Sequence, residues 1–245
     1  MNILSIGNGI SSDAHRFLPQ MALADDEELL LCNLYIENCS LEQHWNNWRE
    51  EKTDYDYEVY LPFETELNRP DGVALHEAVE DEDWDIITLQ QTTALSGIPE
   101  SYSPFLSELA EYCRMVQPNA KIMVHQTWAY EQGSKLLDER GGYLDQHDMF
   151  NDLEKAYQKA EKAISADGII PSGKVMMQAI DNGIGQIHRD TLHVDLGVGR
   201  YMLGLVWFKV LTGETAKCKF NEFDVEVDEK QVDIAIATVK EVLGE

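Results

Sequence analysis

Short apolar runs alternate along the chain with longer segments in which apolar residues recur every three or four positions. A short apolar run is typical of a buried strand, and the longer period is typical of an amphipathic helix. The runs predict strands at residues 3–6, 29–36, 84–89, 120–125 and 168–170. The longer period predicts helices at residues 11–22, 73–79, 104–115, 149–164 and 197–211, another that begins near residue 40, and a last one with Val232, Ala235, Ile236, Val239 and Leu243 on one face.

Local signals mark where two of these helices begin. Ser11, Ser12 and Asp13 follow the first strand and can cap the free N–H groups of the next helix. Ser40 stands three residues before Gln43, which is the spacing of a capping box. Residues 54–63 are aromatic and irregular, and they fit either a hairpin or an extended insertion.

The alternation of strands and helices predicts an α/β fold. Short apolar strands of this kind form a parallel sheet that is covered by helices on both faces. No repeat, linker or change in composition divides the chain, so we expect a single domain over residues 1–245. Ligands of such sheets bind beyond the carboxyl ends of the strands, which makes the segments just after each strand the candidate site.

The net charge of the chain argues against several classes of binding partner. The chain has 19 basic and 45 acidic side chains, and its formal net charge is −26. Such a surface repels nucleic acids, anionic membranes and polyanionic substrates, and a neutral or cationic substrate approaches it more easily. No stretch is long and apolar enough for a membrane span. The first residues lack the pattern of a signal peptide, so we expect a cytoplasmic protein.

The cysteines give no sign of a metal site. Cys32, Cys39, Cys113 and Cys218 form no CxxC pair, and no cluster of histidines accompanies them. We expect reduced thiols, no zinc and no cofactor. The turn after the first strand is also too short for a phosphate-binding loop, which argues against a flavodoxin-like nucleotide binder.

An acid–histidine pair lies among the segments that follow the strands. Asp190 stands three residues before His193. In a turn, this carboxylate can hold the imidazole Nδ1–H and leave Nε2 free to act as a base. A surface histidine has the same spacing by chance, so the pair alone does not identify an active site.

Several segments together resemble the SGNH hydrolases, in particular a bacterial branch classed as a domain of unknown function. The matches run in order over about residues 3–213. The residues that carry the resemblance are Ile3-Leu4-Ser5-Ile6-Gly7-Asn8, Ser11, Asp13-Ala14, Asn33-Leu34-Tyr35-Ile36, Cys39-Ser40-Leu41-Glu42, His44, Trp84-Asp85, Leu89-Gln90-Gln91, residues 125–130 and 167–173, Asp190, His193, Gly199-Arg200-Tyr201 and Leu211-Thr212-Gly213.

The resemblance implies a three-layer α/β/α sandwich with a flavodoxin-like parallel sheet, and it implies ester hydrolysis. In this family a serine after the first strand attacks the ester, a histidine takes its proton, and an aspartate orients the histidine. The roles of base and orienting acid fall on His193 and Asp190. The oxyanion donors are the N–H at the nucleophile position, the N–H of Asn38, and one amide side chain, either Gln90 or Gln91. Adjacent strand residues point to opposite sides, and we favour Gln91.

The match fails at the nucleophile, because Gly9 occupies the position of the serine. The neighbouring phenylalanine of the family is Ile10, and a Gly-Gly pair is replaced by Glu37 and Asn38. A carboxylate at position 37 opposes a developing oxyanion by about 1–4 kcal/mol, depending on screening. The joint change is typical of natural divergence, whereas an engineered Ser→Gly exchange would alter one residue.

Two routes to activity remain. Ser11 or Ser12 can replace the missing nucleophile, although Ser11 lies on a different helical face from Gly9. Alternatively, His193 can activate a water molecule directly, with Asp190 orienting it. His125, Trp128 and Tyr130 follow a strand and fit either the wall of a sugar site or the core.

Two functions are consistent with the sequence. The first is a short-chain acyl or acetyl esterase that acts on a carbohydrate or small-molecule ester. The second is a catalytically inactive descendant that binds a ligand or a partner protein in the pocket that was catalytic in its ancestors. The retained Asp190 and His193 favour the first function, and Gly9 with Glu37 favours the second. The sequence does not indicate an oligomeric state.

Overall fold

The computed structural model describes residues 1–216 and 223–244. Within them, one sheet has the strand order β3-β2-β1-β4-β5-β6. Only β3 is antiparallel to its neighbour. The five parallel strands follow the flavodoxin-like order, so the predicted α/β fold is confirmed. The strands are β1 (Asn2–Gly7), β2 (Leu30–Tyr35), β3 (Asp56–Tyr60), β4 (Ile86–Leu89), β5 (Lys121–His125) and β6 (Gly168–Ile170).

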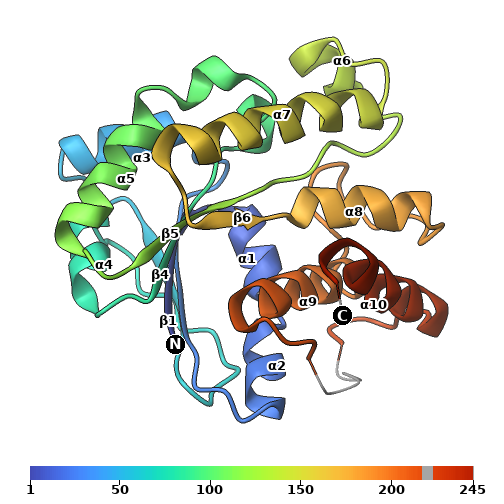
Figure 1. Ribbon diagram of the computed structural model, residues 1–245, viewed down its shortest axis with the longest axis horizontal. Coiled ribbons are helices and arrows are strands. Elements are labelled where there is room, and N and C mark those ends of the chain that lie inside the picture. The colour runs from blue at the N-terminus through green and yellow to red at the C-terminus, as the bar shows by residue number, and fades with distance from the viewer. Residues whose placement is uncertain (217–222, 245) are drawn as a thin grey trace.

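Helices cover both faces of the sheet (Figure 1). Successive residues of β1 point into opposite layers, since Ile3 belongs to one apolar cluster and Leu4 to the other. The first layer holds α1 (Gly9–His15), α2 (Leu18–Ala24), α8 (Ser172–Asp181), α9 (Val198–Thr212) and α10 (Glu229–Leu243). The second layer holds α3 (Leu41–Arg49), α4 (Leu75–Asp81), α5 (Phe105–Val116) and α7 (Gln146–Ile164), with α6 (Lys135–Gly141) against α7.

The first predicted helix is two helices in the structure. α1 ends at His15, and α2 begins at Leu18 with Pro19 in its first turn. Proline is tolerated there but cannot lie inside one continuous helix without losing a hydrogen bond. The cap of α1 is Asn8, whose Oδ1 accepts from the N–H of Ile10, and not a serine. The predicted cap of α3 is confirmed, because Ser40 Oγ accepts from the N–H of Gln43.

The irregular segment 54–63 contains β3 at the edge of the sheet. The chain then returns beside it, with bridges between Val59 and Asn68 and between Tyr55 and Val73. The segment therefore forms part of a hairpin, which is one of the two structures that its sequence allowed. The helices α6 and α8 were not expected. α8 contains Gly173, where a Cβ would lie 2.0 Å from the carbonyl oxygen of Thr127, so only glycine allows the helix to pack this closely.

The structure describes three of the four cysteines. Cys32, Cys39 and Cys113 are buried and free, and Cys218 lies outside the described residues. Burial raises the pKa of Cys113 to about 12, so this thiol stays protonated. Among residues 1–216 and 223–244, no helix is long and apolar enough to cross a membrane. The same part of the chain contains no cluster of three metal-ligating side chains.

Candidate active site

The structure brings Gly9 and His193 together at the carboxyl end of the sheet. β1 ends at Gly7, and α1 begins two residues later at Gly9. A Cβ at Gly9 would lie 3.1 Å from His193 Nε2 and 3.8 Å from Tyr35 Cε2. The imidazole therefore faces the position from which the side chain of residue 9 would project. This is the relation that a nucleophile and its base require.

Asp190 holds His193 in this orientation. Its Oδ2 lies 2.8 Å from His193 Nδ1, and its Oδ1 accepts the backbone N–H of the same residue at 2.7 Å. Thr191 completes the turn with a φ of 68°. Partial burial raises the pKa of Asp190, whereas its hydrogen bonds with His193 lower it. The lowering effects together are larger, so the pKa of Asp190 lies below its usual value. The carboxylate therefore stays ionised at neutral pH, where it favours a proton on Nδ1.

Trp128 forms a hydrogen bond that helps to hold the same turn in place. It is fully buried, and its indole N–H donates to the carbonyl oxygen of Leu192 at 2.7 Å. It does not form the wall of a sugar site. His125 and Tyr130 are buried as well. Burial lowers the pKa of His125 to about 3, so this imidazole is neutral and serves the core. Of the two alternatives for His125 and Trp128, the structure supports the core and not the wall of a sugar site, because tertiary packing covers both rings.

The two glutamines are also internal. Gln91 accepts from the N–H of Leu41 and donates to Ser101, and no part of it is exposed. Gln90 Nε2 donates to Asn8 Oδ1 at 2.7 Å, and its Oε1 lies 2.9 Å from His125 Nδ1. The preference for Gln91 as the amide that faces the site is wrong, since its hydrogen bonds are made within the protein. Gln90 approaches the site only through Asn8.

Asn38 lies at the rim of the site. Its φ is 54°, a left-handed conformation that favours glycine and tolerates asparagine. The next residue, Cys39, accepts a hydrogen bond through its carbonyl oxygen from Asn8 Nδ2 at 3.0 Å. Asn8 thereby joins this loop to the start of α1. Glu37 is exposed, so solvent screens the charge that the sequence places near the oxyanion position.

The two serines of α1 have different surroundings. Ser11 is buried, and its hydroxyl donates to Gln90 Oε1 at 2.6 Å, so it has no access to substrate. Ser12 lies three residues after Gly9, on the same helical face. Its hydroxyl donates to Glu58 Oε2 at 2.6 Å. No contact joins Ser12 to His193 in the described part of the chain, and His193 faces Gly9 instead.

Two hollows lie near the turn that carries His193; His193 itself lines the first, and Leu192 lines the second. We call the first the charged groove; its volume is about 370 Å³, and its lining is Gly9, Ser12, Asp13, Arg16, Tyr35, Glu37, Glu58, Tyr60, Leu67, Arg69, Arg189, Asp190, His193 and Arg200. We call the second the neutral pocket; its volume is about 490 Å³, and its lining is Asn38, Ser40, Thr92, Thr93, Ala94, Leu95, Tyr130, Leu136 and Leu192. Both volumes are in the range of small-molecule sites.

The sequence did not indicate the ion pairs of the charged groove. Asp13 is buried and pairs with Arg189 at 3.0 Å and with Arg200 at 2.8 Å. Glu58 is buried beside Arg69 at 3.4 Å. The sequence held one indication that Asp13 belongs to the site. Asp13 lies four residues after Gly9, which places both on one face of a helix. The arginines come from distant segments, and only the fold brings them together.

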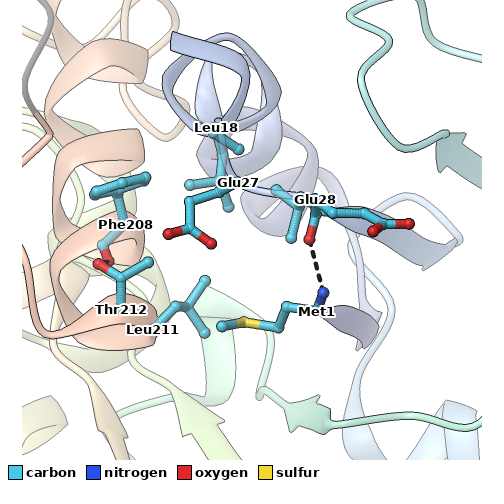
Figure 2. A pocket seen from close by; sticks show the side chains of 9 residues that line it. Met1, Leu18, Glu27, Glu28, Phe208, Leu211 and Thr212 are labelled. Carbon is cyan, nitrogen blue, oxygen red and sulfur yellow. Dashed lines mark hydrogen bonds between the residues drawn. The ribbon is translucent and has the colours of Figure 1, made fainter. Parts of the chain in front are cut away.

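A third recess lies at the opposite end of β1. Figure 2 shows it beside Met1, with Leu18, Phe208 and Leu211 around it. The Met1 ammonium donates there to the carbonyl oxygen of Glu28 at 2.7 Å. Its volume of about 20 Å³ is near that of one water molecule. This recess is too small for an ester.

Comparison with known proteins gives a family and a fold. The family model described as "Domain of unknown function (DUF4886)" matches residues 2–240. A crystal structure of a DUF4886 family protein from Bacteroides uniformis is 30% identical, with a TM-score of 0.91, covering 99% of this chain and 94% of that one. No curated protein sequence matches significantly.

More distant structures share the architecture. A protein from Slackia heliotrinireducens described as a candidate SGNH hydrolase has a TM-score of 0.62 and 18% identity, covering 86% of this chain and 98% of that one. An acetylxylan esterase from Geobacillus stearothermophilus has a TM-score of 0.56 and 10% identity, covering 89% and 97%. At these identities the likeness shows the fold.

Proposed function

This chain belongs to the DUF4886 family and has the fold of the SGNH hydrolases, and from that premise we propose that it hydrolyses a short-chain ester with His193 as general base. One observation carries the proposal: His193 Nε2 faces position 9 while Asp190 holds Nδ1. Because Gly9 has no nucleophilic atom, the nucleophile in this proposal is a water molecule. Because no side chain projects from Gly9, the space in front of Nε2 can admit a water molecule within hydrogen-bond distance of this nitrogen.

The proposed reaction balances without a covalent intermediate. His193 Nε2 takes a proton from water as the water oxygen bonds to the ester carbonyl carbon. The backbone N–H groups of Gly9 and Asn38 are the proposed oxyanion donors. The tetrahedral intermediate then expels the alcohol oxygen, which receives the proton from His193, and the carboxylic acid leaves. Asp190 stays ionised throughout and stabilises the imidazolium.

This route is slower than that of an enzyme with a serine. A triad that has lost its nucleophile keeps an acceleration of only about 10³–10⁴-fold over the uncatalysed reaction. A second candidate function is therefore a ligand-binding or partner-binding descendant without turnover, and Gly9 is the observation that favours it. The fold shared with an acetylxylan esterase supports a carbohydrate ester as the substrate, with another small-molecule ester as the alternative.

Hydrolysis of an aryl acetate by the wild-type protein and by His193→Ala tests the proposal. We expect weak turnover in the wild type and a fall to background in the variant. His147→Ala is the matched control, because His147 pairs with Asp181 on the surface, away from the site. Turnover that survives His193→Ala would refute the assigned base, and no turnover in any of the three proteins would favour the binding function.

A further inference from the structure

The charged groove extends away from His193 along α1. Gly9, Ser12, Asp13 and Arg16 line it at positions i, i+3, i+4 and i+7, so they form one continuous face of α1 and its cap. The opposite wall comes from β3 and the segment that returns beside it, which contribute Glu58, Tyr60, Leu67 and Arg69. A ligand held at His193 can therefore continue into this groove.

The lining of the groove is rich in charge and balanced in sign. The chain has seven arginines, and four of them line the groove. Among the described residues, four carboxylates line it too: Asp13, Glu37, Glu58 and Asp190. The formal charges of this lining therefore cancel, although the chain has a net charge of −26. Outside the lining, Arg16 and Arg200 also pair with Asp224, and Arg69 also pairs with Asp56.

Two of these carboxylates are held inside the protein by several partners. Asp13 is 1% exposed and accepts from both Arg189 and Arg200. Glu58 is 5% exposed and accepts from Ser12 and from Asn33 Nδ2, the latter at 2.8 Å. Arginine side chains present several fixed donors and carboxylates present only acceptors, so the groove offers both kinds of group along its length.

This arrangement discriminates between ligands by charge. An anion in the groove is attracted by the four guanidinium groups but repelled by the four carboxylates, and a cation meets the reverse. For either ion, repulsion cancels part of the attraction. A hydroxyl group donates and accepts at once and fits between the two kinds of partner. Resting on the proposed function, we propose that the alcohol half of the ester is a neutral polyol, such as an uncharged oligosaccharide, and that it lies in the charged groove.

The acyl half then enters the neutral pocket. Residues adjacent in sequence line the two hollows, since Leu192 and Asn38 line the pocket while His193 and Glu37 line the groove. The pocket lining contains no charged side chain among the described residues. Thr93 is 2% exposed and its hydroxyl has no partner in the described part of the chain, which provides a polar contact for a ligand in this pocket.

Calorimetric binding of three trisaccharides to the wild-type protein tests the assignment without requiring turnover. The probes are a neutral xylose trimer, an anionic galacturonate trimer and a cationic glucosamine trimer. We expect the neutral trimer to bind about tenfold more tightly than either charged one. Failure of the neutral trimer to bind, or tighter binding of a charged trimer, would overturn the proposal.

Two substitutions that each remove one charge from the groove sharpen the test. Glu58→Gln gives the groove a net positive charge and should shift the preference about tenfold toward the galacturonate trimer. Arg69→Gln gives it a net negative charge and should shift the preference toward the glucosamine trimer. Arg114→Gln is the matched control, because Arg114 bonds the carbonyl oxygen of Ser165 outside the groove. Preferences that do not move with Glu58 and Arg69 would contradict the location of the sugar.

Aryl acetate turnover of the same proteins separates the two proposals. An aryl acetate has no polyol to place in the groove, so its hydrolysis depends on His193 alone. Sugar binding without any turnover would refute the hydrolytic function and leave the groove assignment in place. Turnover without sugar binding would refute the groove assignment alone.

Discussion

At the scale of single residues, the site depends on how two side chains are held. His193 has one nitrogen on Asp190 and the other facing Gly9. Asp190 is half exposed, yet it remains oriented by two backbone N–H groups, those of Leu192 and His193. The base therefore keeps a working geometry although the residue that it would activate is a glycine.

Three buried imidazoles make stability depend on pH. Burial lowers the pKa of His15, His44 and His125 to about 3 each, while an unfolded chain has a histidine pKa near 6.5. Below about pH 6.5 the unfolded chain takes up protons that the folded protein does not. The free energy of unfolding should therefore fall by about 1.4 kcal/mol per imidazole for each pH unit between about 6 and 4.

Urea unfolding at pH 7, 6 and 5 measures this effect. The expected result is a midpoint that falls with pH, and a smaller fall in His44→Gln than in the wild type. A matched substitution of the exposed His147 should leave the pH dependence unchanged. A wild-type midpoint that stays constant from pH 7 to pH 5 would show that these imidazoles are not held neutral.

The spacing of residues predicted the Asp190–His193 pair, because both partners lie within one turn. It did not predict the positions of Gln90 and Gln91, because their hydrogen-bond partners are distant along the chain: Ser101 and Leu41 for Gln91, His125 and Asn8 for Gln90. An amide that is buried by such contacts has the same local sequence as one that faces a ligand.

At the scale of elements, Asn8 links the two loops of the site. Its Oδ1 caps α1 and its Nδ2 bonds the loop after β2. We expect Asn8→Ala to lower the free energy of unfolding by about 1–3 kcal/mol, since it removes a helix cap and leaves buried groups unpaired. Asn8→Asp keeps the capping oxygen but replaces the Nδ2 donor with a charged oxygen that faces the carbonyl oxygen of Cys39, so it should be destabilised as well. Denaturant unfolding of both variants checks this, and wild-type stability in Asn8→Ala would contradict it.

The parallel strands were predictable because each is a short, mostly apolar run that ends near a turn residue. β3 was not, because it is an antiparallel edge strand whose Glu58 is buried. In register across the sheet, Glu58 pairs with Asn33, and Asn33 pairs with Ser5, which forms a polar row beneath α1. A polar row inside a layer breaks the hydrophobic pattern that sequence reasoning uses.

At the scale of the whole molecule, the excess acidic side chains, which give a net charge of −26, repel one another. At about 0.1 M salt, repulsion between exposed charges more than about 10 Å apart is largely screened. We expect the midpoint of thermal unfolding at pH 7 to rise by several degrees as sodium chloride increases from about 0.01 to 0.5 M. A midpoint at pH 7 that falls with salt would mean that favourable ion pairs outweigh the repulsion.

The most direct test of the account is Gly9→Ser. The new side chain needs a shift of a few tenths of an ångström in His193, since its Cβ would lie 3.1 Å from Nε2. We expect aryl acetate hydrolysis to rise by about 10²–10³-fold over the wild type, and a fluorophosphonate probe to label the introduced hydroxyl covalently. A variant that folds but shows neither a faster rate nor labelling would contradict the claim that this site keeps the geometry of an ester hydrolase.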